Sequence, residues 1–185
     1  MVLEKLEKSL LNCPVIKKGD YFYFVNPLTD GVPLIETGLL TSIIDFIVDN
    51  FEINVDKIIA IEAMGIPLAT ALSLRTGIPF VIIRKRPYGL KGEHIVSQET
   101  GYSKNKLYIN GLDKGDNVLI IDDVISTGGT LVSLINVLKD MDVNIQNIIV
   151  PVEKDDGKKI VKEKTGHDVN TIVKVKMVDG KVTLV

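Results

Sequence analysis

Short apolar runs and helical apolar spacing alternate along most of this chain. Runs of four or five apolar residues lie at 58–61, 80–83, 118–121 and 148–152. Runs of this length are typical of strands that are buried on both faces of a sheet. Between them, apolar residues recur every three or four positions, as in amphipathic helices. The alternation predicts an α/β fold in which helices flank a mostly parallel, twisted sheet.

The same pattern gives approximate bounds for the other elements. Helices are expected near 2–12, 36–51, 66–76, 131–138 and 158–164. Further strands are expected at 21–25, 169–178 and 182–185, the last two around an Asp179-Gly180 hairpin turn. Residues 87–106 lack apolar periodicity and predict a long loop, interpreted as a lid; the alternative is a flexible hairpin. The turn-rich stretch 26–33 is either a connector or a second lid.

Composition narrows the class of protein. A chain of 185 residues suits one domain, here 1–185, with a sizeable core. The net charge is −2 with acids and bases interspersed, which argues against a nucleic-acid surface. No apolar run reaches the length of a membrane span, and the first eight residues do not resemble a signal peptide. The single cysteine, Cys13, excludes an internal disulfide, so a cytoplasmic protein is expected.

One stretch, Val118–Thr130, combines a strand, two acids, a small-residue loop and a helix start. A loop that opens a helix offers free backbone N–H groups and the positive end of the helix dipole. Glycines let such a backbone close around a phosphate, and hydroxyl side chains add donors. The adjacent acids, Asp122 and Asp123, suit the hydroxyls of the same ligand, or a metal. The pattern indicates a phosphorylated sugar; the alternative is an ordinary strand-helix turn with solvated acids.

Two other predicted strands end in residues that could hold a second anion. The strand at 58–61 is followed by Glu62-Ala63-Met64-Gly65, and the strand at 80–83 by Arg84-Lys85-Arg86. The carboxyl ends of parallel strands meet at one edge of a sheet, where ligands bind. The chain lacks a Walker lysine motif and a Gly-x-Gly-x-x-Gly fingerprint, which argues against a nucleoside triphosphatase and a dinucleotide-dependent dehydrogenase.

Val118–Thr130 resembles the phosphoribosylpyrophosphate motif of type I phosphoribosyltransferases, and the resemblance extends from Asn26 to Val185. It implies that fold, with hood elements at about 14–35 and in the C-terminal segment and a flexible loop at about 87–106. It also implies transfer of 5-phosphoribose to a purine, with release of pyrophosphate and Mg²⁺ as cofactor. The implied partners are phosphoribosylpyrophosphate, a purine base and a second copy of the chain in a homodimer.

The resemblance assigns roles residue by residue. Asp122 and Asp123 would be catalytic, binding the ribose hydroxyls and, mostly indirectly, the metal. The 5′-phosphate would be held by Ser126, Thr127, Gly128, Gly129 and Thr130. Pyrophosphate would contact Ala63, Met64 and Gly65, a loop often held by a cis peptide, together with Arg84 and Lys85. Asn26 and Lys154 would contact the base.

The identity of the base stays open on these grounds. Lys154 resembles the lysine of xanthine-type enzymes, and an ammonium donates to a 6-oxo group rather than accepting from a 6-amino group. Adenine phosphoribosyltransferases carry a glutamate where this chain has Gly101, although Glu99 is close by. The whole chain is most similar to archaeal hypoxanthine/guanine phosphoribosyltransferases. The alternatives are an adenine enzyme and a non-catalytic regulator that senses purines or phosphoribosylpyrophosphate.

Overall fold

The centre of the computed structural model, which describes residues 2–19, 21–100 and 103–185, is a parallel sheet of four strands. Its order is β4-β3-β7-β9, and every neighbouring pair is parallel. These strands are β3 (Lys57–Ile61), β4 (Phe80–Ile83), β7 (Asn117–Ile121) and β9 (Asn144–Ile149). The predicted α/β sheet is confirmed, and three of its strands match the apolar runs.

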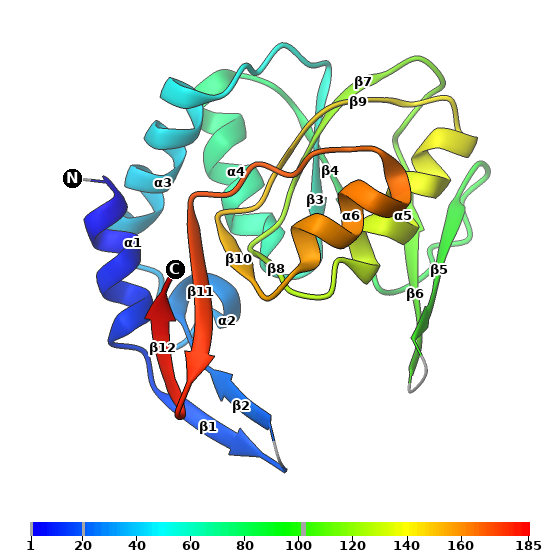
Figure 1. Cartoon of the computed structure of the whole chain (residues 1–185). Helices are drawn as coiled ribbons and strands as arrows, with labels where there is room; N and C mark the ends of the chain where they lie inside the picture. The colour runs from blue at the N-terminus through cyan, green and yellow to red at the C-terminus, as the bar shows by residue number, and fades with distance from the viewer. Residues whose placement is uncertain (1, 20, 101–102) are drawn as a thin grey trace.

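Both faces of this sheet are buried, as the apolar runs require. In β3, Ile58 and Ala60 join one hydrophobic cluster, whereas Ile59 and Ile61 join the other. Helices α3 (Thr37–Asn50) and α4 (Gly65–Thr76) contribute to the first cluster, and α5 (Gly129–Asp140) and α6 (Gly157–Thr165) to the second. Figure 1 shows these two helix pairs on opposite sides of the sheet. The four helices confirm the predicted layers.

A second sheet, of order β12-β11-β10-β8, continues from the first. It contains β8 (Val124–Ile125), β10 (Val152–Lys154), β11 (Val173–Val178) and β12 (Lys181–Leu184). Beside it lie α1 (Val2–Leu11), the hairpin of β1 (Val15–Lys18) and β2 (Tyr21–Phe24), and the short helix α2 (Pro27–Asp30). Figure 1 shows α1, β1, β2, α2, β11 and β12 together on one side of the central sheet, and this group is called the hood below.

The expected strand at 148–152 is divided between the two sheets, so that prediction was wrong. Pro151 has no N–H to donate and interrupts the ladder. The Val150 N–H donates to Asn170, and the Val152 N–H donates to Asp123. The chain therefore ends β9 beside β7 and begins β10 beside β8. This step places β10, which ends at Lys154, beside β8, the strand that follows the acidic pair.

Over most of 87–106 the structure has the hairpin that was the alternative interpretation, and not an irregular loop. Residues His94–Thr100 form β5 and Ser103–Ile109 form β6, an antiparallel hairpin. Only every second residue near its root is buried, namely Val96, Leu107 and Ile109, so the apolar pattern was too sparse to recognise. Backbone hydrogen bonds between Arg84 and Tyr108 attach the hairpin to the end of β4. Residues 101 and 102, including Gly101, lie outside the described part, as does Asp20.

The first strand and the first short helix of the hood were not predicted. β1 is half exposed, and α2 has only four residues, too few for a periodic pattern. Within the described part of the chain, none of the helices combines the length and the apolar character that crossing a membrane requires.

Candidate active site

A cavity of about 650 Å³ lies beyond the carboxyl ends of β3, β4 and β7, where ligands bind in open parallel sheets. It brings together six predicted site residues: Ala63, Met64, Lys85, Asp122, Asp123 and Thr130. It is also lined by Ile61, Glu62 and Leu107, and by two residues that the sequence did not single out, Thr29 and Lys106. The edge of the sheet, the hood and the hairpin thus share one cavity.

The acidic pair forms one wall of this cavity. The backbone N–H of Asp122 donates to Ile149 at 3.3 Å, and Asp123 is only 8% exposed. Burial raises the pKa of Asp122 well above its ordinary value, and the charge of Asp123 raises it further. Burial raises the pKa of Asp123 to about 6, although its hydrogen bond to Asp122 lowers it. Two such carboxyl groups gain most from a ligand that supplies hydroxyl donors or a cation.

The loop between the acidic pair and α5 has the geometry of an anion site. Helix α5 begins at Gly129, and Gly128 before it has a φ of 69°, which favours glycine. A Cβ on Gly128 would lie 2.7 Å from the carbonyl oxygen of Gly157, so the turn before α6 packs directly on this loop. Thr130 lines the cavity, whereas Ser126, Thr127, Gly128 and Gly129 lie next to it in the chain. Their role in binding a phosphate remains a prediction.

The loop after β3 packs on the acidic pair. The Glu62-Ala63 peptide bond is cis, and Met64 precedes the first residue of α4. A Cβ on Gly65 would lie 2.9 Å from the carbonyl oxygen of Ile121 and 3.3 Å from Asp122 Oδ1. Glycine is therefore required at position 65 for this loop to approach the end of β7.

Cations from two elements face the same loop. Lys85, directly after β4, and Lys106, on β6, both line the cavity. Arg84 does not line it: its Nε is buried and lies 3.5 Å from Glu62 Oε2. Glu62 also accepts a hydrogen bond of 2.7 Å from the Lys85 backbone N–H. Arg84 and Glu62 thus orient the segment that carries Lys85.

The two predicted base contacts have different surroundings. Lys154 is buried, and its Nζ lies 5.6 Å from the centre of the Phe24 ring; burial lowers the pKa of its ammonium. Asn26 is fully buried: its Oδ1 accepts from the Leu28 N–H, and its Nδ2 donates to Ser9 Oγ. Neither lines the cavity, and both remain predicted base contacts. The bonds of Asn26 make it the cap of α2 and anchor α2 to α1.

Asp30 organises the hood around the cavity. Its carboxylate accepts hydrogen bonds from the Tyr23 hydroxyl, the Asn26 N–H and the Thr29 hydroxyl. Burial raises the pKa of Tyr23 to about 12, and the Asp30 carboxylate contributes to this rise. Thr29 is thereby fixed at the cavity. No sequence signal marked Thr29, and Lys106 could have been found only by recognising the alternation around Leu107.

The carboxylate oxygens at the cavity fit a magnesium ion. In residues 2–19, 21–100 and 103–185 there is no group of three or more His, Cys, Asp or Glu side chains that could hold a metal. Asp122 and Asp123 supply two carboxylates at the cavity. Mg²⁺ binds oxygen ligands, keeps several waters and is commonly held by one or two carboxylates together with substrate phosphates.

Comparisons with known proteins agree with this geometry. The chain is 56% identical over 181 residues to the hypoxanthine/guanine phosphoribosyltransferase of Methanothermobacter thermautotrophicus, covering 98% of this chain and 94% of that protein. It is 55% identical over 185 residues to the enzyme of the same name from Methanothermus fervidus, covering 100% and 98%.

Among solved structures, adenine phosphoribosyltransferase from Saccharomyces cerevisiae superposes with a TM-score of 0.75 at 24% identity, covering 92% of this chain and 98% of that chain. The enzyme of that name from Thermoanaerobacter pseudethanolicus gives 0.74 at 24%, covering 93% and 99%. At this identity the likeness shows the fold alone. Residues 36–180 match the family described as "Phosphoribosyl transferase domain". With the acidic pair, the loop before α5 and the cis-peptide loop at one cavity, the chain belongs to the phosphoribosyltransferases of type I fold.

Proposed function

We propose that this chain transfers 5-phosphoribose from phosphoribosylpyrophosphate to hypoxanthine and guanine, giving IMP and GMP in purine salvage. The observation that carries the proposal is the cavity itself, where paired acids, a helix start and two lysines meet at one sheet edge. Two relatives that share more than half of their residues with the chain over nearly its full length bear the corresponding enzyme name.

Phosphoribosylpyrophosphate is proposed to lie along the edge of the central sheet. Its 5′-phosphate occupies the loop Ser126–Thr130, at the positive end of α5. Its ribose hydroxyls donate to Asp122 and Asp123, whose buried charges gain these hydrogen bonds. Its pyrophosphate lies over Ala63–Gly65, with Lys85 and Lys106 on the same side. A bound Mg²⁺, held by Asp122, Asp123 and ligand oxygens, would neutralise part of the charge of the leaving group.

The reaction then depends on charges that the chain holds in place. The bond from C1′ to the pyrophosphate oxygen breaks and its electron pair leaves with pyrophosphate, while the base nitrogen bonds to C1′ and its proton passes to the departing pyrophosphate or to water. Lys85 and Lys106 stabilise the negative charge that grows on pyrophosphate, and the two carboxylates stabilise positive charge on the ribose. Arg84 acts by fixing Glu62 and the Lys85 backbone.

For the base, Lys154 is proposed to donate to the 6-oxo group of the purine. The buried ammonium lies against the Phe24 ring, so its charge is shielded from water. Asn26 is proposed to act on the base mainly by holding α2 in place. An acceptor at position 6 is present in hypoxanthine and guanine and absent in adenine, which sets the expected selectivity.

Steady-state rates with adenine, hypoxanthine, guanine and xanthine, with Mg²⁺ and phosphoribosylpyrophosphate, test the proposal. Hypoxanthine and guanine should give the highest kcat/KM. A preference for adenine would overturn the base assignment while leaving the family unaffected. Binding of ligands without turnover on any base would favour the sensing regulator.

The role of Lys154 has a separate test. Lys154→Met keeps the length of the side chain but removes the donor, and should lower kcat/KM for hypoxanthine by about 10- to 100-fold, as expected for a charged hydrogen bond in a buried site. Lys159→Met, on the exposed face of α6, is the matched control and should stay within twofold. Equal rates in both variants would remove Lys154 from the base subsite.

The assembly and its compartment are also proposed. Exposed apolar side chains on the segment after β4, namely Tyr88, Leu90 and Ile95, suit contact with a second copy in a homodimer. Light scattering during size-exclusion chromatography should give twice the mass of the 20.4 kDa chain. A cytoplasmic location is proposed because a donor that carries several phosphate charges does not cross a lipid bilayer unaided.

A further inference from the structure

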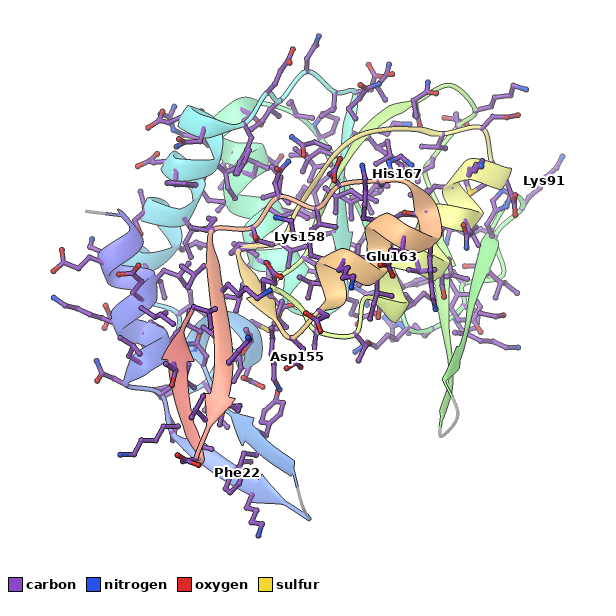
Figure 2. The ribbon with its side chains drawn as sticks, in the orientation of Figure 1. Phe22, Lys91, Asp155, Lys158, Glu163 and His167 are labelled. Atoms are coloured by element: carbon purple, nitrogen blue, oxygen red, sulfur yellow. The ribbon has the colours of Figure 1, made fainter. Side chains whose placement is uncertain are left out.

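Asp155 lies in the turn between β10 and α6, beside the phosphate loop rather than within the motif that marks it. Its carboxylate accepts a hydrogen bond from Ser126 Oγ at 3.0 Å. Figure 2 shows Asp155 at this turn, at the end of α6 where the helix begins. The residue directly before it is Lys154, the proposed base contact.

The two turns are held together closely. Parallel pairing of β8 with β10 sets Val124 beside Val152 and Ile125 beside Glu153. A Cβ on Gly157 would lie 2.3 Å from the Ser126 carbonyl oxygen, and one on Gly128 would lie 2.7 Å from the Gly157 carbonyl oxygen. Asp155 itself has a φ of 59°, a conformation that Asp and Asn adopt more readily than most residues. The carboxylate is therefore set in place by backbone packing on both sides.

The hydrogen bond has a direction that matters for phosphate. An ionised carboxylate can only accept, so the single hydroxyl proton of Ser126 is directed at Asp155. A phosphate group also accepts hydrogen bonds and carries negative charge. It cannot use the Ser126 proton while Asp155 holds it, and the two anions repel each other.

We propose that Asp155 is a positioning residue that holds the Ser126 hydroxyl while the 5′-phosphate subsite is empty and gives it up when a phosphate enters. The inference rests on the proposed function, since it takes Ser126 as part of the phosphate subsite. In the empty site Asp155 keeps the loop in its binding shape. In the occupied site its charge opposes the phosphate and so favours release of the nucleotide product. The same charge favours the protonated form of the buried Lys154, which ties the phosphate and base subsites to one side chain.

The test is the affinity of the full-length protein for ribose 5-phosphate, measured by titration calorimetry. Asp155→Asn keeps an acceptor and tolerates the backbone conformation, but it removes the charge. It should tighten ribose 5-phosphate binding about three- to tenfold, because a hydrogen bond to a neutral group is weaker and easier to displace. The KM for phosphoribosylpyrophosphate should fall by a similar factor without a rise in kcat.

Asp156→Asn is the matched control, since Asp156 is an exposed neighbour whose side chain makes no capping bond and whose replacement changes the net charge equally. It should alter affinity less than twofold. In a Ser126→Ala background the effect of Asp155→Asn should shrink to the smaller part that comes from charge repulsion, because the shared hydrogen bond is already gone. An effect of undiminished size in that background, or weaker binding by Asp155→Asn, would overturn the inference. If the wild-type protein did not bind ribose 5-phosphate at all, the phosphate subsite and the inference would both fail.

Discussion

At the scale of single residues, the acidic pair is costly for the folded protein in the absence of ligand. The folded-state pKa of Asp123, about 6, lies above its ordinary value of 3.8. The unfolded chain therefore loses its proton first as the pH rises. The free energy of unfolding is highest below about pH 4 and falls as the pH rises through 6. Above pH 6 it stays at this lower value. Ligand hydroxyls and a cation would offset this loss of stability when they bind.

Asp123→Asn should remove most of this cost. About two pKa units correspond to roughly 3 kcal/mol, so the ligand-free variant should be more stable than wild type by about 2–3 kcal/mol at pH 8 and equal to it near pH 3. Its kcat/KM should fall about 100-fold or more, because a group that contacts the ribose loses its charge. Urea unfolding between pH 3 and pH 8 measures the first effect. Asp140→Asn, exposed at the end of α5, should change neither quantity. Equal stability of wild type and Asp123→Asn across this range would contradict the buried charge.

Lys106 belongs to the candidate site only because the fold places β6 at the cavity. Lys106→Met should raise the KM for phosphoribosylpyrophosphate about tenfold, since a cation beside the leaving group is lost, and should leave the KM for the base unchanged. Lys91→Met is the control: Lys91 lies between β4 and β5, and Figure 2 shows its side chain directed away from the body of the protein. This control should retain wild-type kinetics. An unchanged KM in Lys106→Met would exclude the lysine from the pyrophosphate side.

At the scale of elements, the position of α6 depends on a glycine. The site for a Cβ on Gly157 is occupied by the Ser126 carbonyl oxygen and by Ile125. Gly157→Ala should therefore lower the free energy of unfolding by about 1–3 kcal/mol through overpacking. Gly38 is likewise in the first turn of a helix, and a Cβ there would meet only the flexible Lys5 ammonium. Gly38→Ala should raise stability by about 0.5–1 kcal/mol. Denaturant midpoints distinguish the two; a neutral Gly157→Ala would mean that the two turns can separate.

Elements with strong local signals were predictable and the others were not. The buried runs of β3, β4 and β7 and the periodic helices α3 to α5 carry their pattern in consecutive residues. Among the side chains of β5 that the structure describes, Val96 alone is buried, so the strand looks like a loop in the sequence. Pro151 separates β9 from β10 inside one apolar run, and a strand of three residues such as β10 depends on its neighbours rather than on propensity.

The candidate site follows the same rule. Asp122 to Thr130 are consecutive, so their chemistry is visible before the fold is known. Thr29, Lys106 and Asp155 come from three other elements and reach the site only through tertiary packing. A sequence read by itself gives them no reason to be grouped.

At the scale of the whole molecule, the cavity joins parts that the sheets leave separate. Its lining includes Thr29 from the hood, Lys106 from the hairpin, and residues from the central sheet and α5. The hood and the hairpin share no strand pairing with each other in the described structure. If phosphoribosylpyrophosphate contacts the hood, the hairpin and the central sheet, its binding should stabilise all three.

The last prediction concerns this coupling. At 100 times its Kd, phosphoribosylpyrophosphate with Mg²⁺ should add about 2.7 kcal/mol to the free energy of unfolding, provided that it binds only the folded chain. Hydrogen exchange should slow in α2 and at the root of β6 as well as in the loop before α5, because the ligand closes local opening of each part. Asp123→Asn should lose most of this protection, whereas Lys154→Met, altered only at the base, should keep it. Protection confined to the loop before α5 would mean that the donor binds there without engaging the hood or the hairpin, and that Thr29 and Lys106 act at another step.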